Sequence, residues 1–181
     1  PYLGLVHRLD QPVSGVLVFA KNKKAAADLS NQISNGSMKK FYYALIYGTP
    51  IRERDTLEDY SYKDGRENLS LIVNATFPDA KKAILNYRHC STLMVLEEGE
   101  EVSLMEIELL TGRHHQIRVQ MAGVGAPLWG DNKYNPEFVN KRGYFPIALR
   151  AFRLSFCHPT TGKRMEFEVP CNWEQLETKA D

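Results

Sequence analysis

The feature that most constrains the fold is a succession of extended segments joined by short polar turns. These segments are rich in branched and aromatic residues, which favour strands. Strands outnumber the expected helices, so the sequence predicts an α+β fold: a mixed, mostly antiparallel β-sheet with flanking helices. The expected strands cover residues 2–9, 15–20, 39–47, 57–62, 69–73, 83–90, 102–110, 148–157 and 164–169.

Three helices are expected around this sheet. A stripe of apolar residues with helical spacing predicts the first over residues 22–35. A second is expected between Gly112 and Gly123, with Thr111 as its N-cap. A third, short and polar, is expected to begin at Asn172.

Length and composition indicate one domain with its own core. The chain has 181 residues, of which 43% are hydrophobic and 25% charged. It begins in a strand without an initiator Met, so we expect residues 1–181 to be a single catalytic domain truncated at its N-terminus. No membrane-spanning run or signal peptide is visible, and we expect a cytoplasmic monomer. The net charge is only +1, so any nucleic-acid surface must come from local clustering.

A carboxylate with an arginine two residues before it lies between two apolar runs near the start of the chain. Alternate side chains of an extended segment share a face, so Arg8 and Asp10 are expected to point the same way. Pro12 disfavours helical geometry before it, while Ser14 and Gly15 favour a turn. This pattern predicts an acid presented on a tight loop, as catalytic residues often are. The alternative is a charged surface turn with a solvent-exposed ion pair.

Residues 111–118 (TGRHHQIR) are dense in polar side chains where a strand gives way to a helix. A helix N-terminus favours anions, and arginines placed there need a negative partner such as a phosphate or a buried carboxylate. Adjacent His114 and His115 are expected to diverge, which disfavours a metal site. A solvated basic helix start without a role is the other alternative. If the fold brings Arg118 to Asp10, each charge gains the partner that burial requires.

Two further segments combine aromatic side chains with glycines or cations. For residues 125–131, a structural turn around a packed Trp129 is the favoured interpretation. Residues 39–40 are lysines followed by aromatics, a pattern that can contact an RNA backbone and stack a base. Strand alternation puts Tyr42 and Tyr43 on opposite faces, so only one of them can enter a given pocket. The alternative is a core tyrosine with both lysines in solvent.

These segments form an ordered series of motifs. They read HRLDQPVSG from His7, KFYYA from Lys40, TGRHHQIR from Thr111, GAPLWGD from Gly125 and LRAFRLSFCHP from Leu149. In order and spacing the series resembles the signatures of the RluA-type RNA pseudouridine synthases, and it spans nearly the whole chain.

The resemblance implies the pseudouridine synthase fold and an isomerase acting on uridine in structured rRNA or tRNA. The target base is flipped out, the bond from ribose C1′ to N1 breaks, and C1′ joins C5, without a metal or cofactor. Asp10 matches the family's catalytic aspartate, with its role as nucleophile or base left open. Arg118 matches the arginine that pairs with it, and Tyr42 matches the tyrosine that stacks on the base.

The other candidate residues are expected to bind substrate. Arg8 matches a residue that helps to hold the RNA stem open, and Ile117 is expected to line the pocket. Arg113 and Lys40 are candidates for phosphate contacts. His115 completes the expected substrate-binding set.

The chain departs from the family pattern at three positions, which leaves its substrate preference open. Val13 stands where Thr is usual, His114 where Thr or Ser is common, and Gln120 where His is common. Two other functions remain to be weighed. A catalytically inactive RNA-binding module is disfavoured by the retained aspartate, tyrosine and arginine. A carboxylate-dependent glycosidase or nucleosidase needs a second acid, for which Asp131 is the best candidate but has the context of a structural residue.

Overall fold

The computed structural model describes residues 1–48, 52–95, 101–171 and 173. Its main sheet has eight strands in the order β10-β9-β4-β8-β7-β5-β6, with β2 added parallel to β9. All the other pairings in this sheet are antiparallel, which confirms the expected fold class. The strands are β2 (Ser14–Gly15), β4 (Lys39–Tyr47), β5 (Arg54–Asp64), β6 (Leu69–Val73), β7 (Lys81–Val95), β8 (Glu101–Leu109), β9 (Leu149–Cys157) and β10 (Arg164–Glu168).

The N-terminal segment is less regular than predicted. A small separate sheet pairs β1 (Gly4–Leu5) with β3 (Phe19–Ala20), and only β2 joins the main sheet. The predicted strands over residues 2–9 and 15–20 were therefore too long. The chain between β1 and β3 instead turns across the sheet and is held by side chains that pack onto the core.

In the described part of the chain, three helices accompany the sheet: α1 (Lys23–Ser34), α2 (Gln116–Gly123) and the single turn α3 (Pro136–Val139). The Asn22 side chain caps α1 by accepting a hydrogen bond from the Ala25 N–H at 2.8 Å. The prediction of Thr111 as the cap of α2 was wrong. The Thr111 hydroxyl accepts instead from the Ile84 N–H on β7, and α2 begins after His115 without a side-chain cap.

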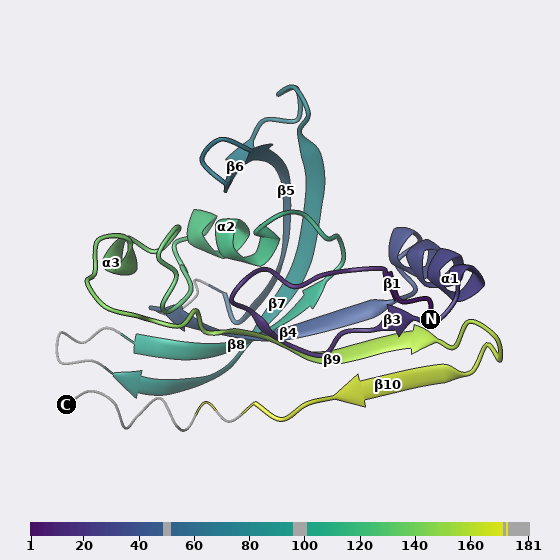
Figure 1. Ribbon diagram of the computed structural model, residues 1–181. Helices are drawn as coiled ribbons and strands as arrows, with labels where there is room; N and C mark the ends of the chain where they lie inside the picture. The colour runs from purple at the N-terminus through teal and green to yellow at the C-terminus, as the bar shows by residue number, and fades with distance from the viewer. Residues whose placement is uncertain (49–51, 96–100, 172, 174–181) are drawn as a thin grey trace.

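The main core cluster lies between the sheet and α2. Alternation on β4 directs Tyr42, Ala44 and Ile46 into this cluster, where Ile117 and Met121 of α2 meet them. In Figure 1, α2 and α3 lie on the same side of the sheet, and β5 and β6 rise beside α2. The face of β4 that bears Tyr42 is therefore the face on which the helices and their loops build a site.

Two expectations concern the ends of the chain and membranes. Asn172, where a third helix was expected, lies outside the described residues. No helix in the described part of the chain is long and apolar enough to cross a bilayer.

Candidate active site

A cavity of about 270 Å³ opens where the loop before β2, strand β4 and the turn before α2 meet. It collects seven of the eight site residues expected from the sequence, contributed by segments far apart in the chain. They are Arg8, Asp10, Lys40, Tyr42, Arg113, Ile117 and Arg118. His115 is absent from this lining and borders a neighbouring hollow instead.

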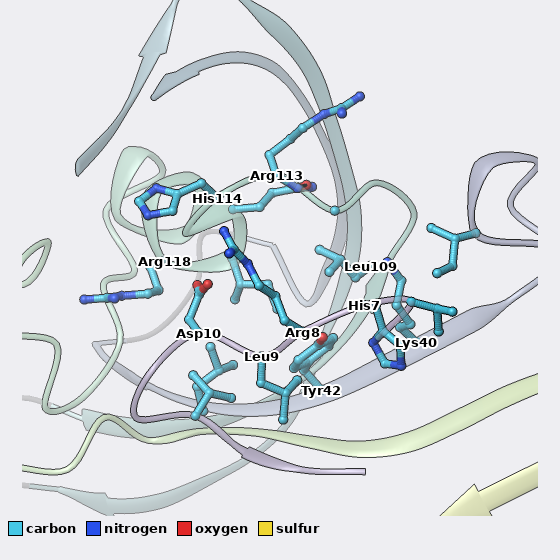
Figure 2. A pocket seen from close by; sticks show the side chains of 17 residues that line it. His7, Arg8, Leu9, Asp10, Lys40, Tyr42, Leu109, Arg113, His114 and Arg118 are labelled. Atoms are coloured by element: carbon cyan, nitrogen blue, oxygen red, sulfur yellow. Dashed lines mark hydrogen bonds between the residues drawn. The ribbon is translucent and has the colours of Figure 1, made fainter. Parts of the chain in front are cut away.

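The loop that carries Asp10 is fixed on both sides. The Val13 N–H donates to the Asp10 carbonyl at 2.7 Å, and Leu9 and Val13 pack against the main core cluster. Figure 2 shows Arg8 and Asp10 on the same side of this segment, as alternation predicts. The Asp10 carboxylate is half-buried, and no described residue forms a hydrogen bond or ion pair with it. The acid is therefore held at the cavity by its backbone and is free to meet a ligand.

Close backbone packing beside this loop explains why residue 15 is a glycine. The Val16 N–H donates to the Ala151 carbonyl at 2.8 Å, where β2 pairs with β9. Gly15 has a φ of +142°, and a Cβ at this position would lie 2.1 Å from the Ala151 carbonyl oxygen. Only glycine allows the loop to approach the sheet this closely.

Arg118 does not pair with Asp10 as expected. Its Nε and Nη2 donate to the two carboxylate oxygens of Asp131 at 2.8 and 2.6 Å, and both side chains are buried. Figure 2 shows the Arg118 guanidinium directed away from Asp10. The fold supplies another carboxylate in the loop after α2, and a two-point pair with it satisfies the buried guanidinium. The glycosidase alternative loses its second acid, because Asp131 is engaged in this pair.

The turn before α2 is organised by Gln116. Its Oε1 accepts from the Thr111 hydroxyl at 2.8 Å and from the Arg113 N–H at 2.9 Å, while its Nε2 donates to the Ile84 carbonyl and to Gln120. These bonds tie the turn to the first residue of α2 and to β7. They also fix the backbone that places Arg113, His114 and Ile117 around the cavity.

Tyr42 forms part of the buried wall of the cavity, whereas Tyr43 lies on the other face of β4 and stacks on Phe152 at 3.7 Å. Alternation therefore separates the two tyrosines as predicted. Burial, together with the negative charge of Asp10, raises the pKa of Tyr42 well above its usual value. Its hydroxyl is consequently protonated at neutral pH.

Only one of the two lysines before Tyr42 enters the site. Lys40 is 9% exposed and lines the cavity, whereas Lys39 lies 3.4 Å from Glu108 on the opposite face. Burial and the nearby charge of Arg113 lower the pKa of Lys40. No described carboxylate pairs with Lys40, so this buried amine has no ion-pair partner among the described residues.

His7 lies beside Lys40 in the cavity wall (Figure 2). Its Nε2 accepts a hydrogen bond from the Val18 N–H at 3.3 Å. Burial, reinforced by the charge of Lys40, lowers the pKa of His7 to about 4. A neutral imidazole that accepts from the backbone has a structural task, because it ties the segment before Asp10 to the segment before β3.

The two adjacent histidines stack instead of diverging, which corrects the expectation. Their ring centroids are 3.8 Å apart, because His115 adopts a left-handed backbone with a φ of +50°. The Nδ1 of His115 is 2.9 Å from the Tyr134 hydroxyl, which accepts from the Ser70 N–H at 2.6 Å. Burial and the charge of Arg118 lower the pKa of His115 to about 3. His115 is therefore a neutral link between α2 and β6.

Arg113 and His114 complete the rim. The Arg113 Nε donates to the Lys82 carbonyl at 2.8 Å, and the side chain is exposed and extends away from Asp10 in Figure 2. His114 lines the cavity, and its carbonyl oxygen accepts from the Ser70 hydroxyl at 2.7 Å. Among the described residues, no group of three or more histidine, cysteine or acidic side chains is arranged to hold a metal ion.

The chain that forms this site is similar to known proteins. The sequence model of a family described as RNA pseudouridylate synthase matches residues 1–123, about two thirds of the chain. The chain belongs to the RluA-type RNA pseudouridine synthases.

The sequence of this chain also matches curated relatives. It is 38% identical over 168 residues to the uncharacterized RNA pseudouridine synthase YlyB of Bacillus subtilis (strain 168), covering 92% of this chain and 52% of that protein. It is 32% identical over 175 residues to an uncharacterized RNA pseudouridine synthase of Helicobacter pylori (strain J99), covering 96% of this chain and 52% of the relative. The chain thus spans about half the length of these relatives.

Solved structures agree. Human RNA pseudouridylate synthase domain containing 1 superposes with a TM-score of 0.78 at 27% identity, covering 94% of this chain and 70% of the human chain. Human RNA pseudouridylate synthase domain containing 4 gives a TM-score of 0.72 at 21% identity, covering 96% and 73%, and shows the shared fold alone.

Sequence reasoning missed part of the synthase site. It did not single out Tyr134, which lies under the Arg118 guanidinium at 5.1 Å and bonds His115. It considered Asp131 as an acid catalyst but not as the partner of Arg118. The available signal was the spacing, because Tyr134 follows three residues after Asp131 and the Asp131 side chain accepts from the Tyr134 N–H at 3.2 Å.

Proposed function

We propose that this chain isomerises uridine to pseudouridine in structured RNA, with rRNA and tRNA as the substrate classes, acting as a cytoplasmic monomer. One observation carries the proposal. In a chain of this family, the Asp10 carboxylate lies at a nucleoside-sized recess without a protein partner, beside a protonated tyrosine and an unpaired lysine.

The group that the proposed reaction most requires is a carboxylate beside the ribose of the target uridine. A carboxylate can attack C1′ or remove a ribose proton as the bond from C1′ to N1 breaks. Uracil then turns, and C5 bonds to C1′ as the bond from C1′ to the carboxylate breaks or as the carboxylate returns the ribose proton. The proton on C5 leaves and N1 gains a proton, so the product is an isomer of the substrate. No oxidant, reductant or metal is needed to balance these steps.

Tyr42 and Ile117 are suited to hold the base. Both are buried and line the cavity opposite the loop that carries Asp10. An aromatic ring and an aliphatic side chain can hold a flipped uracil while the neutral phenol donates a hydrogen bond. Tyr42 therefore acts as a stacking surface and a hydrogen-bond donor before any proton transfer.

Arg118 acts on Asp10 by a different route from the one expected. Its pair with Asp131 anchors α2 to the following loop, and Arg118 is among the residues that line the cavity. Arg118 is therefore a positioning residue that fixes the wall facing Asp10.

The cations around the cavity are suited to the RNA backbone. Arg8, Lys40 and Arg113 line it, while Asp10 is its one carboxylate among the described residues. Phosphates neutralise such a surface and give binding that falls with salt. Arg8, exposed beside Asp10, is placed to contact the strand from which the uridine is flipped.

Release of tritium from RNA that carries [5-³H]uridine tests the proposal directly, since C5 must lose its hydrogen. We expect release from unmodified rRNA or tRNA transcripts with the wild-type chain. Asp10→Asn keeps the shape of the side chain and should reduce the rate by roughly a thousandfold or more, as should Asp10→Ala. Asp28→Asn, on α1 outside the cavity lining, is the matched control and should retain full activity.

The outcome separates the enzyme from its main alternative. RNA binding without tritium release by the wild-type chain would identify a non-catalytic RNA-binding module. Release that survives in both Asp10 variants would remove Asp10 from the mechanism.

A further inference from the structure

A second hollow of about 580 Å³ adjoins the catalytic cavity. The two share the loop at Arg8, Leu9 and Asp10, together with His114 and Arg118. The far wall of the second hollow comes from residues 130–147, which include α3. A molecule bound at Asp10 can therefore continue into this space without leaving the protein surface.

The far wall presents aromatic side chains. Tyr144 is 82% exposed, the largest exposed fraction among the large hydrophobic side chains described. Phe145 and Phe138 lie in the same wall, and their rings contact each other edge to face at 5.3 Å. Exposing a tyrosine ring so fully has no benefit for the fold, whereas an open ring at the rim of a hollow can stack on a flat ligand.

The same wall is cationic. The Lys141 Nζ lies 5.0 and 5.1 Å from the ring centres of Phe138 and Phe145, and the Lys133 Nζ donates to the Asn68 carbonyl. Within the described part of the chain, neither lysine forms an ion pair. Among the described residues, Asp10 is the only carboxylate lining the hollow, so the chemistry of the hollow favours an anion that also carries an aromatic group.

We infer that this hollow binds the nucleotide that flanks the target uridine, with its base stacked on Tyr144 and its phosphate beside Lys133 and Lys141. The inference rests on the proposed function, because it places the everted uridine at Asp10. A nucleotide joined to that uridine must pass Arg8 and His114, which border both spaces. Stacking tolerates every base, so the hollow adds affinity for exposed strands and a preference for strongly stacking purines.

A double-mutant cycle tests the contact. One partner is Tyr144→Ala, and the other is the RNA pentamer r(AAUAA), in which abasic ribose phosphates replace the adenosines on both sides of the uridine. We expect Tyr144→Ala to weaken binding of the intact pentamer roughly five- to thirtyfold, and the abasic change to weaken wild-type binding at least as much. The abasic change should weaken binding to Tyr144→Ala less than it weakens binding to the wild type. The two effects should differ by about the factor by which Tyr144→Ala weakens binding of the intact pentamer.

Two protein controls accompany the cycle, and fluorescence anisotropy measures every affinity. Tyr144→Phe keeps the ring and should bind like the wild type. Phe167→Ala removes another exposed ring, on β10 outside both spaces, and should change nothing.

Every outcome is decisive. Independent effects of the two changes, unchanged binding by Tyr144→Ala, or no binding of the pentamer would each overturn the inference. Tritium release by the wild type without this coupling refutes the flanking site and leaves the proposed activity intact. Coupling without tritium release by the wild type would refute the proposed activity and leave the flanking site intact.

Discussion

At the residue scale, the strongest constraint on the site is the buried pair of Arg118 and Asp131. Their side chains are 4% and 0% exposed, so neither charge can be hydrated if the other is lost. Two ions taken out of water are tolerated here because the guanidinium meets both carboxylate oxygens and the carboxylate also accepts from the Lys133 and Tyr134 N–H groups. The pair therefore fixes the shape of the wall opposite Asp10.

Asp131→Asn should destabilise the fold by about 3–5 kcal/mol, because it leaves the Arg118 charge buried without a counterion. Urea denaturation followed by circular dichroism measures the loss. Glu58→Gln is the control, since its pair with Lys82 is open to solvent and should contribute little to stability. A loss below about 1 kcal/mol for Asp131→Asn would mean that solvent or another group compensates the guanidinium.

The neutral histidines predict a pH dependence of stability. The pKa of His115 is about 3 in the folded chain, against a value near 6.5 in an unfolded chain. Between these values the unfolded state binds more protons, so the free energy of unfolding must fall as the pH drops from about 6.5 toward 3. His7, with a pKa of about 4, adds to the loss in the same direction.

His115→Asn isolates this contribution. Asparagine tolerates the left-handed backbone at this position, and its side chain does not titrate between pH 7 and pH 4. The urea midpoint should fall less between pH 7 and pH 4 in the variant than in the wild type, although carboxylates titrate in both. Parallel pH profiles would show that His115 is not held neutral by the fold.

At the element scale, the catalytic loop depends on its contact with β9. The loop has few hydrogen bonds of its own, and β2 provides the only strand pairing of the described chain between β1 and β3. Gly15 makes that pairing possible through its approach to Ala151. The two residues of β2 therefore help to hold the position of Asp10, together with the packing of Leu9 and Val13 on the core.

Gly15→Ala should displace this loop from the sheet. The added Cβ overlaps the Ala151 carbonyl at 2.1 Å, and the φ of +142° is unfavourable for alanine, so we expect a loss of roughly 2 kcal/mol or more in stability. Tritium release should fall with it, because Asp10 moves. Gly65→Ala is the control, since nothing lies within 4 Å of its Cβ position. Unchanged activity in Gly15→Ala would show that Asp10 is placed without β2.

Most of the helices and strands could be predicted, because the spacing of apolar residues that indicates them is a local property of the sequence. The strand over residues 39–47 and the strand over residues 69–73 match the structure, and the first helix differs from its prediction by one residue at each end. The start of α2 was not predictable, because no side chain caps it and the turn before it is held by Gln116, whose side chain bonds the Arg113 N–H and the Ile84 carbonyl of β7. The first strands were predicted too long because their irregular pairing depends on contacts with other segments, which the local sequence pattern does not show.

At the scale of the whole molecule, the motifs predicted which residues gather but not how they pair. Asp10, Tyr42 and Ile117 meet at one cavity although more than a hundred residues separate the first from the last. The partner of Arg118 could not be predicted, because the motifs contain two aspartates, Asp10 and Asp131, and only the path of the loop after α2 decides between them. The stacking of His114 on His115 also depends on a backbone conformation that spacing does not reveal.

The distribution of charge, rather than its total, should govern RNA binding. The chain is nearly neutral, yet its catalytic face carries Arg8, Lys40 and Arg113 around one carboxylate. Lys39 and Lys40 are neighbours in the sequence that point to opposite faces of β4, which makes them a matched pair. Lys40 can reach a phosphate in the cavity, whereas Lys39 is near Glu108 on the other side.

Lys40→Gln should therefore weaken RNA binding and reduce the slope of log affinity against log salt by about 0.7–0.9, the effect of losing one phosphate contact. Lys39→Gln removes the same charge from the chain and should leave the slope unchanged. Anisotropy titrations of a labelled tRNA transcript between roughly 50 and 200 mM salt measure both slopes. If the two variants shift the slope equally, net charge drives binding. If only Lys40→Gln shifts the slope, the RNA backbone binds in the cavity. A phosphate of the RNA is then the anion that pairs with Lys40, for which the described chain provides no carboxylate partner.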